Sequence, residues 1–279
     1  MQVTSVDWRR ARELLEGAAY QVAGLLRTIR DPQAPGTGEW TAVETAAHLT
    51  HTFAVDLASA RGEDLDLPPP MASPVTALGK VSDFNADNLG SDGERDLAVL
   101  ATRIEEIAAN FLADTADSAG DEPTTWLGGV KLPVSALACH WIGESILHGL
   151  DIARGNGLKW EIEPEWAGLS FAGFSIPVIE AFDPRSLVDQ QRAEGLTARV
   201  DLRVRGFGRT LFVLEDGALR VESPGSGKVD CHLLVDPATN FLMSWGRISP
   251  LRAMAKGRLI AWGRRPGRAL KLTQVVRTP

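Results

Sequence analysis

The sequence contains only two cysteines, Cys139 and Cys231, which lie far apart and form no CxxC pattern. A disulfide framework is therefore not expected, and a reducing cytoplasm is the expected compartment. The chain also has no run of about 18 apolar residues, the length that a membrane-spanning helix requires. Its first residues, MQVTSVDWRRARELLEG, lack the apolar segment of a signal peptide. We therefore expect neither membrane insertion nor export.

The chain has fewer basic than acidic residues. The chain has 29 Lys and Arg against 36 Asp and Glu, which gives a formal net charge of −7 at pH 7. A nucleic-acid partner held through phosphate contacts is therefore not expected. Basic residues do cluster between Arg247 and Arg277, where they could serve an anionic ligand locally. A solvated surface is the simpler interpretation of that cluster.

The composition is otherwise that of an ordinary globular protein. Hydrophobic residues make up 44% of the chain and charged residues 23%, enough of each to build a core and a solvated surface. A length of 279 residues is sufficient for two domains.

The first half of the chain has the pattern of amphipathic helices, with apolar residues recurring every three or four positions. Thr41 followed by Glu44 forms a capping box, so one helix should begin there. Segments rich in proline and glycine, such as DPQAPGTGE, DLDLPPPMASP and SAGDEPTTWLGGVKLP, are predicted loops between the helices. The expected helices cover residues 7–30, 41–60, 75–89, 94–116 and 134–155.

The pattern changes after about residue 184. Apolar and polar residues alternate in TARVDLRVRGFG and RTLFVLEDGALRVES, and Asp216–Gly217 predicts a hairpin turn within the second stretch. VDCHLLVD and RLIAWG predict two further strands, with short helices between them. We therefore predict a helical domain at 1–160, a connecting helix at 161–183 and a small α+β domain at 184–279.

The predicted helix that contains HWIGESILHGLD has one polar stripe. His140, Glu144 and His148 follow one another at intervals of four, so they share a face of a helix that is otherwise apolar. A buried carboxylate without a partner costs several kcal/mol, so Glu144 requires a cation or strong donors. Two histidines and a glutamate are ordinary zinc ligands and leave a coordination position open. His48, on an earlier helix, is the best ligand from elsewhere, and His51 is the reserve.

Three segments resemble a known family. GEWTAVETAAHL resembles the W-[ST]…H-L segment of the DinB-like metal-binding four-helix bundles, and ESILHGLDIARG resembles the E-x-x-x-H-x-x-D segment of the mycothiol-dependent maleylpyruvate isomerases. DCHLLVDPATNFLMSWGRISPLRAMAKGRLIAWG resembles the sterol-carrier-protein-2-like domain that these isomerases carry after the bundle. The resemblance covers nearly the whole chain and implies a two-domain α+β protein, with a four-helix bundle followed by a small α/β sandwich.

The resemblance also implies a chemistry. It makes His48, Glu144 and His148 the ligands of a metal ion, expected to be Zn²⁺, and adds a low-molecular-weight thiol, mycothiol or another, as second cofactor. The implied activity is isomerisation or group transfer on a small electrophilic substrate. In an isomerisation, the thiol would add to an activated double bond and leave again after rotation about the saturated bond.

Further polar residues are expected around this site. Asp151 is predicted either to hold the free N–H of a ligand histidine or to form an ion pair with Arg154 or another arginine. His51 and His140 do not match ligand positions of the family, so they are expected behind the ligands or lining the substrate site. Arg247 is predicted to face a substrate carboxylate or the thiol cofactor, and capping of the preceding helix is its simpler role.

Two other functions remain open at this stage. The second domain could bind a lipid or another apolar ligand, or the scaffold could carry a metal-dependent thiol S-transferase or hydrolase. The first alternative would use a pocket lined by Leu211, Phe212, Leu233, Phe241, Leu242 and Trp245. The expected partners are a small-molecule substrate and a thiol, and no feature of the sequence specifies an oligomeric state.

Overall fold

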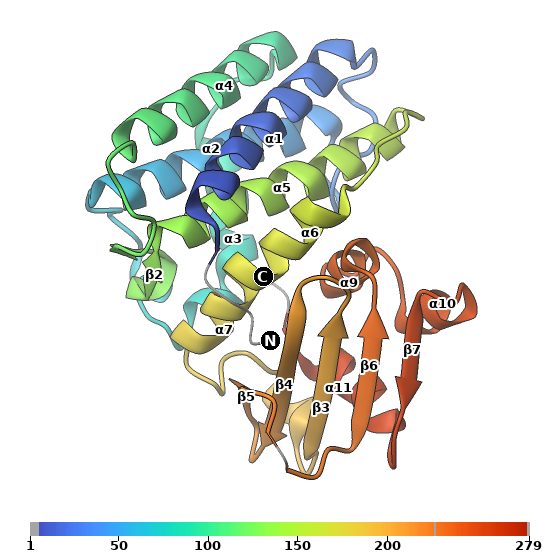
Figure 1. The fold of residues 1–279 in the computed structure, drawn as a ribbon. Coiled ribbons are helices and arrows are strands. Elements are labelled where there is room, and N and C mark those ends of the chain that lie inside the picture. The colour runs from blue at the N-terminus through green and yellow to red at the C-terminus, as the bar shows by residue number, and fades with distance from the viewer. Residues whose placement is uncertain (1–5, 226, 278–279) are drawn as a thin grey trace.

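The computed structural model describes residues 6–225 and 227–277. It has a bundle of helices followed by a C-terminal domain built on a five-stranded sheet (Figure 1). The α+β fold expected from the sequence is confirmed. Among the described residues, no helix combines the length and the apolar character needed to cross a membrane.

Four long helices form the bundle. Two of them, α1 and α2, each pack against both α4 and α5. Helix α2 begins with the predicted capping box, in which the Thr41 hydroxyl accepts a hydrogen bond from the Glu44 N–H and the Glu44 carboxylate accepts one from the Thr41 N–H. A shorter helix, α3, packs on α2. The bounds are Trp8–Thr28 for α1, Ala42–Arg61 for α2, Val81–Ser91 for α3, Leu97–Asp114 for α4 and Val134–Gly155 for α5.

Helix α5 is the most deeply buried helix of the bundle. Every residue from Val134 to Leu150 is buried, because α1, α2 and α6 (Pro164–Ser170) all pack against this helix. Its polar residues are therefore enclosed by protein. After α6, a short π-helical stretch (Phe171–Ser175) and α7 (Ile176–Ala181) continue the helical connection to the second domain.

The sheet of the second domain has the strand order β5-β4-β3-β6-β7. β3 runs parallel to β6, and the other neighbouring pairs are antiparallel. The predicted hairpin joins β4 to β5, and both of its turn residues, Asp216 and Gly217, have the positive φ that this tight turn requires. The bounds are Ala198–Val204 for β3, Gly208–Glu215 for β4, Ala218–Glu222 for β5, Cys231–Val235 for β6 and Leu259–Trp262 for β7.

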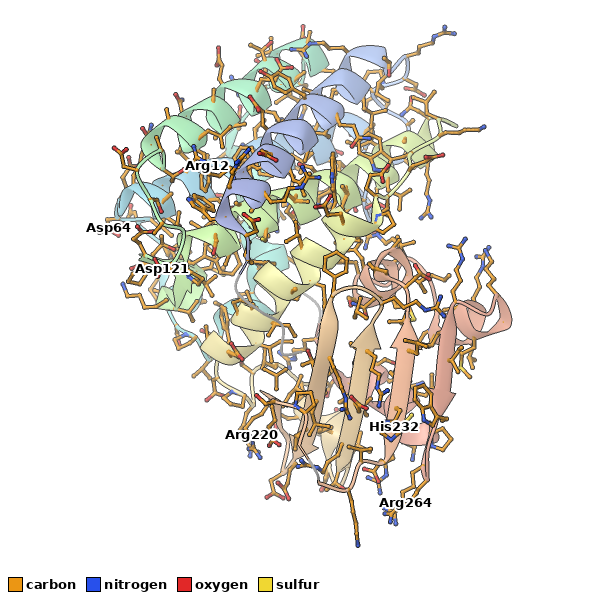
Figure 2. All side chains as sticks on the ribbon, viewed as in Figure 1. Arg12, Asp64, Asp121, Arg220, His232 and Arg264 are labelled. Carbon is orange, nitrogen blue, oxygen red and sulfur yellow. The ribbon has the colours of Figure 1, made fainter. Side chains whose placement is uncertain are left out.

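Helices lie on one face of this sheet, while no described helix covers the outer face of β3, β6 and β7, which carries His232 (Figures 1 and 2). Helix α9 also packs against α6, and α7 packs against β5, so the second domain lies along α6 and α7. The helices of this domain are α8 (Gln190–Ala193), α9 (Pro237–Ser244), α10 (Pro250–Ala255) and α11 (Gly267–Val275).

Three parts of the structure differ from the sequence predictions. The predicted loop between α4 and α5 contains a small antiparallel hairpin, β1 (Pro123–Thr125) with β2 (Lys131–Pro133). Three-residue strands are too short to show an alternating pattern, so only their pairing identifies them. Helix α11 was not predicted either, although it buries Ala269, Leu272 and Val275 at the three-residue spacing of a helix face. The predicted helix at 75–89 is divided into a 3₁₀ turn (Ala77–Gly79) and α3.

Candidate metal centre and adjoining cavity

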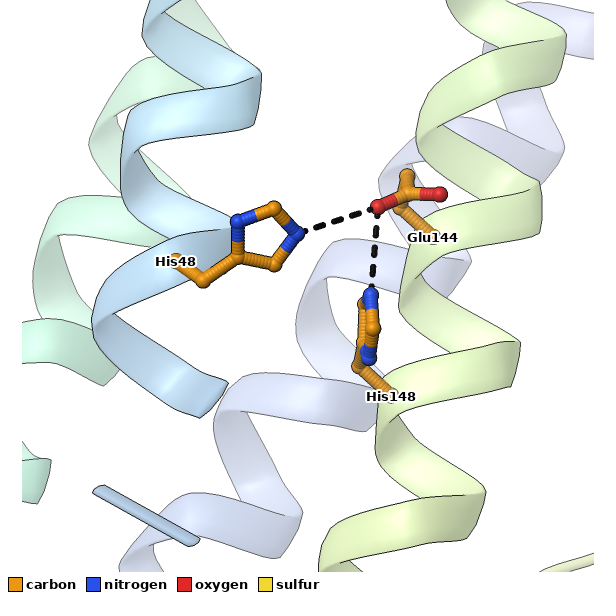
Figure 3. Close-up of side chains that lie close together, drawn as sticks. All are labelled: His48, Glu144 and His148. Atoms are coloured by element: carbon orange, nitrogen blue, oxygen red, sulfur yellow. Dashed lines mark ion pairs between the residues drawn. The ribbon is translucent and has the colours of Figure 1, made fainter. Parts of the chain in front are cut away.

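His48, Glu144 and His148 form a compact buried cluster (Figure 3). Helix α2 supplies His48, and α5 supplies Glu144 and His148, one turn apart. Nε2 of His48 lies 3.5 Å from Oε2 of Glu144, and Nε2 of His148 lies 3.3 Å from the same oxygen. One ligand atom from each residue lies within 4.8 Å of the other two. The three residues thus converge from two facing helices.

The spacing of these atoms fits a zinc ion. Bonds of about 2.0–2.2 Å in a tetrahedral arrangement separate neighbouring ligand atoms by about 3.3–3.5 Å. The two separations between Glu144 and the histidines, 3.5 and 3.3 Å, match that edge length. Two imidazoles and one carboxylate are also a donor set that zinc accepts, with a fourth position left for another ligand.

The charges of the cluster favour a cation. Burial raises the pKa of Glu144, but its contacts with His148 and His48 outweigh burial and hold that pKa well below its usual value. Burial lowers the pKa of His48, which favours the neutral imidazole that a metal requires. Burial also lowers the pKa of His148, but the carboxylates of Asp151 and Glu144 outweigh it and raise this pKa to about 9. A metal at this site therefore competes with a proton on His148.

Asp151 connects the cluster to the second domain. Its Oδ2 lies 3.7 Å from Nδ1 of His148, a distance too long for a hydrogen bond but close enough for electrostatic attraction. The same carboxylate accepts hydrogen bonds from the Thr37 hydroxyl at 2.5 Å and from Arg247, whose Nε donates to Oδ1 at 3.2 Å and Nη2 to Oδ2 at 2.5 Å. Its arginine partner is thus Arg247, from the second domain, and the contacts described for Asp151 do not include Arg154.

His140 is held by a residue that the sequence did not single out. Its Nδ1 lies 2.8 Å from Oδ2 of Asp56, and the indole N–H of Trp126 donates to Oδ1 of Asp56 at 2.9 Å. Asp56 is completely buried. Burial lowers the pKa of His140, but the Asp56 carboxylate outweighs that effect and raises the pKa. The signal in the sequence was a single carboxylate among the apolar residues of TFAVDLASA, two turns after His48.

The His140 ring stacks on Phe174 at 4.2 Å between centroids, and its Nε2 lies 3.7 Å from Oε1 of Glu144. His140 therefore adjoins the cluster without belonging to its compact ligand set. His51 is in a different position. Its Nε2 contacts Oδ2 of Asp92 at 3.1 Å, and it is not brought to Glu144.

A cavity of about 350 Å³ adjoins the cluster. Helices α2, α3 and α5 form much of its wall, and Trp245 and Arg247 reach it from the second domain. All five histidine and glutamate side chains discussed above line it: His48, His51, His140, Glu144 and His148. Residues from both domains therefore line this cavity, and the predicted site residues are among them.

Neither cysteine is a nucleophile of this cavity. Both are free and buried, and neither contributes to the cavity wall. Burial raises the pKa of Cys139 to about 12, so its thiol stays protonated at neutral pH.

Comparison with known proteins identifies the two parts of this fold. Residues 179–275 match the model of the SCP-2 sterol transfer family. A crystal structure of the mycothiol-dependent maleylpyruvate isomerase superposes with a TM-score of 0.53 at 12% identity, covering 90% of this chain and 93% of that one. A mutant of that enzyme with a histidine replaced by alanine gives a TM-score of 0.54 at 12% identity, over 94% and 95% of the two chains. No curated protein matches this chain.

These similarities confirm the two-domain fold expected from the resemblance, with a helical region followed by an SCP2 domain. An identity of 12% shows the shared fold alone.

Proposed function

We propose that this protein is a zinc- and thiol-dependent enzyme that isomerises a small electrophilic substrate or transfers a group to it. The observation that carries the proposal is the His48, Glu144 and His148 cluster, which lines a cavity and in which both histidines lie at a tetrahedral ligand–ligand distance from Glu144. The shared fold supports it, because two solved structures with that fold are of a mycothiol-dependent isomerase. The thiol is mycothiol or a similar small thiol, and the expected compartment is the cytoplasm.

In this proposal His48, Glu144 and His148 hold the metal ion. A bound zinc ion lowers the pKa of a thiol or water that occupies its open position, which makes a nucleophile available at neutral pH. The negative charge of Glu144 partly balances the ion. Asp151 attracts the Nδ1 side of His148 and so favours the orientation in which Nε2 faces Glu144.

Other residues of the cavity would bind and orient the reactants. A cavity of about 350 Å³ suits a small molecule. Asp56 holds Nδ1 of His140, so that Nε2 is the nitrogen left for a hydrogen bond with a reactant. The side-chain amides of Asn85 and Asn88, on α3, offer hydrogen bonds to the polar part of a thiol cofactor.

The guanidinium of Arg247 is not free to bind a substrate anion with all its donors. Its guanidinium already forms a two-point contact with Asp151 and a hydrogen bond to Thr37. We assign it to positioning, because it holds the second domain against the segment of α5 that carries His148. A substrate carboxylate could approach only the part of the guanidinium that remains exposed to the cavity.

Binding of a lipid or another apolar ligand is the second candidate, favoured by the match of residues 179–275 to the SCP-2 sterol transfer family. Of the six residues that would line such a pocket, only Trp245 lines the cavity beside the histidines. Mass spectrometry of an organic extract of the purified protein tests this function. A stoichiometric lipid in protein that contains no metal would favour it over the enzyme.

Metal analysis of the purified protein tests the enzyme proposal first. One zinc ion per chain is expected in the wild-type protein and in His51→Ala, and none in Glu144→Ala. His51 is a suitable control because it lies on α2, one turn from His48, and contacts Asp92 instead. Zinc retained in Glu144→Ala would contradict the assigned site.

Cobalt substitution then tests the thiol. Added thiol should produce a thiolate-to-cobalt charge-transfer band in the wild-type protein. If cobalt binds but none of the small thiols tested produces this band, the metal site would stand and the proposed thiol dependence would be refuted.

A further inference from the structure

The outer edge of the C-terminal sheet is unusually apolar for an exposed surface. β7 is the last strand in the sheet, and α10 packs against it. We call the surface formed by residues 251–265 the β7 edge. The described chain has eight exposed large hydrophobic side chains, and half of them lie on the β7 edge. These are Leu251, Met254, Ile260 and Trp262, with exposed fractions of 63%, 44%, 46% and 40%.

The same surface is basic. Between Arg247 and Arg277 the sequence holds nine Lys and Arg residues and no Asp or Glu, although the whole chain has a net charge of −7. Four of these cations lie exposed on the β7 edge and form no ion pair with any residue that the structure describes. They are Arg252, Lys256, Arg258 and Arg264. Arg265 alone approaches a carboxylate there, at 3.8 Å from Asp230.

The sheet fixes the positions of these side chains. Ile260 and Trp262 are two residues apart on β7, so both side chains project from the same face of the sheet. The Trp262 ring stacks on His232, with 5.2 Å between centroids and 18° between planes, and the Arg203 guanidinium lies 5.6 Å from the centroid of the indole. Arg264 lies at the end of β7 opposite α10, so positive charge extends along the whole edge (Figures 1 and 2).

We propose that the β7 edge binds the surface of an anionic lipid bilayer. An indole suits the boundary between water and hydrocarbon, because it has an apolar ring and a polar N–H. Each Lys or Arg close to an anionic leaflet adds about 1 kcal/mol of attraction. Four unpaired cations beside four exposed apolar side chains supply both contributions at one place, without a segment that crosses the membrane.

A second copy of the chain fits this surface less well. The other exposed large hydrophobic side chains come from four separate segments, Tyr20 on α1, Val99 on α4, and Val75 and Leu158 outside the helices and strands, so no other single segment of the described chain matches the β7 edge. Pairing of β7 with β7 of another copy would bring like charges together. A bilayer is fluid and needs no matching shape.

Co-sedimentation of the full-length protein with lipid vesicles tests the proposal. One set of vesicles contains phosphatidylcholine alone, and the other contains one third phosphatidylglycerol. We expect binding to the anionic vesicles at low salt, weaker binding at high salt because the charges are screened, and no binding to the neutral vesicles. Absence of binding to anionic vesicles at low salt, or equal binding to both sets, would overturn the proposal.

Matched variants locate the binding surface. Arg252→Glu with Lys256→Glu should lower the partition coefficient at least about tenfold, whereas Arg30→Glu with Lys159→Glu, the same charge change on the helical domain, should lower it much less. Trp262→Ser should weaken binding and Tyr20→Ser should not. All four residues of the two charge variants are exposed, and none has an ion pair among the described residues, so the folds should be retained.

Equal loss in the two charge variants would show that only net charge matters, and the β7 edge would be rejected as the site. Size-exclusion chromatography of the wild-type protein provides a separate test. Self-association that disappears in Arg252→Glu with Lys256→Glu, together with absence of vesicle binding, would identify the β7 edge as a protein interface instead.

Discussion

Nδ1 of His140 lies 2.8 Å from Oδ2 of Asp56, and the two residues come from α5 and α2, the same two helices that carry the metal-ligand cluster. Asp56 is completely buried, and its other oxygen accepts the indole N–H of Trp126. The pair therefore fixes one imidazole beside Glu144 and joins α2, α5 and the loop between α4 and α5 at one point.

Replacing Asp56 by alanine should destabilise the protein. The substitution leaves the Trp126 N–H and His140 buried without their acceptor, and each buried polar group left without a partner costs about 1–3 kcal/mol. Thermal unfolding of the metal-free proteins measures the effect. Glu105→Ala is the control, because Glu105 pairs with Arg27 in a partly exposed salt bridge that should contribute less than about 1 kcal/mol. Similar losses of stability in both variants would contradict this account of Asp56.

The two histidines of α2 should differ in their effect on metal affinity. His48→Ala removes a ligand, so the affinity for zinc should fall at least about a hundredfold, whereas His51→Ala should leave it nearly unchanged. Competition with a chromogenic zinc chelator measures both affinities. If His51→Ala weakened zinc binding as strongly as His48→Ala, the ligand set would include His51.

Arg247→Gln should weaken zinc binding less than loss of a ligand does. It removes the two-point contact with Asp151, whose carboxylate lies 3.7 Å from Nδ1 of His148, and loss of such a supporting contact typically costs about 10–100-fold in affinity. Arg252→Gln is the control, since Arg252 is exposed and has no ion pair among the described residues. An unchanged zinc affinity in Arg247→Gln would show that the second domain does not influence the metal centre.

Stability at acidic pH should depend on Asp201. This buried carboxylate accepts hydrogen bonds from Arg209, Arg203 and His232, which outweigh burial and lower its pKa. Because the folded state has the lower pKa, the stabilisation is complete above the unfolded value of about 4 and is lost as the pH falls through the folded value. Asp201→Asn should therefore be less stable at pH 7 by about 1–2 kcal/mol, because its partners Arg203, Arg209 and His232 are partly exposed and can be solvated.

Between about pH 5 and pH 3 the melting temperature of Asp201→Asn should fall less steeply than that of the wild-type protein. Parallel curves for the two proteins over this range would show that Asp201 does not contribute to acid sensitivity. Asp96→Asn, which changes an exposed helix cap and keeps a capping group, is the control for the loss of one carboxylate.

Much of the fold follows from local sequence patterns. Helix α5, Val134–Gly155, agrees with the helix predicted from near Val134 to around Gly155, where an apolar run ends at glycines, and α2 begins at the predicted capping box. The hairpin at Asp216–Gly217 follows from residues that tolerate positive φ. The hairpin of β1 and β2 could not be predicted in this way, because its strands are defined by the partner that each finds.

The sequence by itself determined that Glu144 and His148 share one helix face, since a spacing of four residues places them one turn apart. Only the tertiary structure decided which residues meet that face. Packing of α2 on α5 brings His48 to Glu144, sets Asp56 against His140 and turns His51 towards Asp92. The docking of the second domain likewise made Arg247 the partner of Asp151, whereas the sequence alone allowed Arg154 or another arginine as that partner. Contacts between residues distant in the chain depend on how whole helices pack, and no local spacing encodes that.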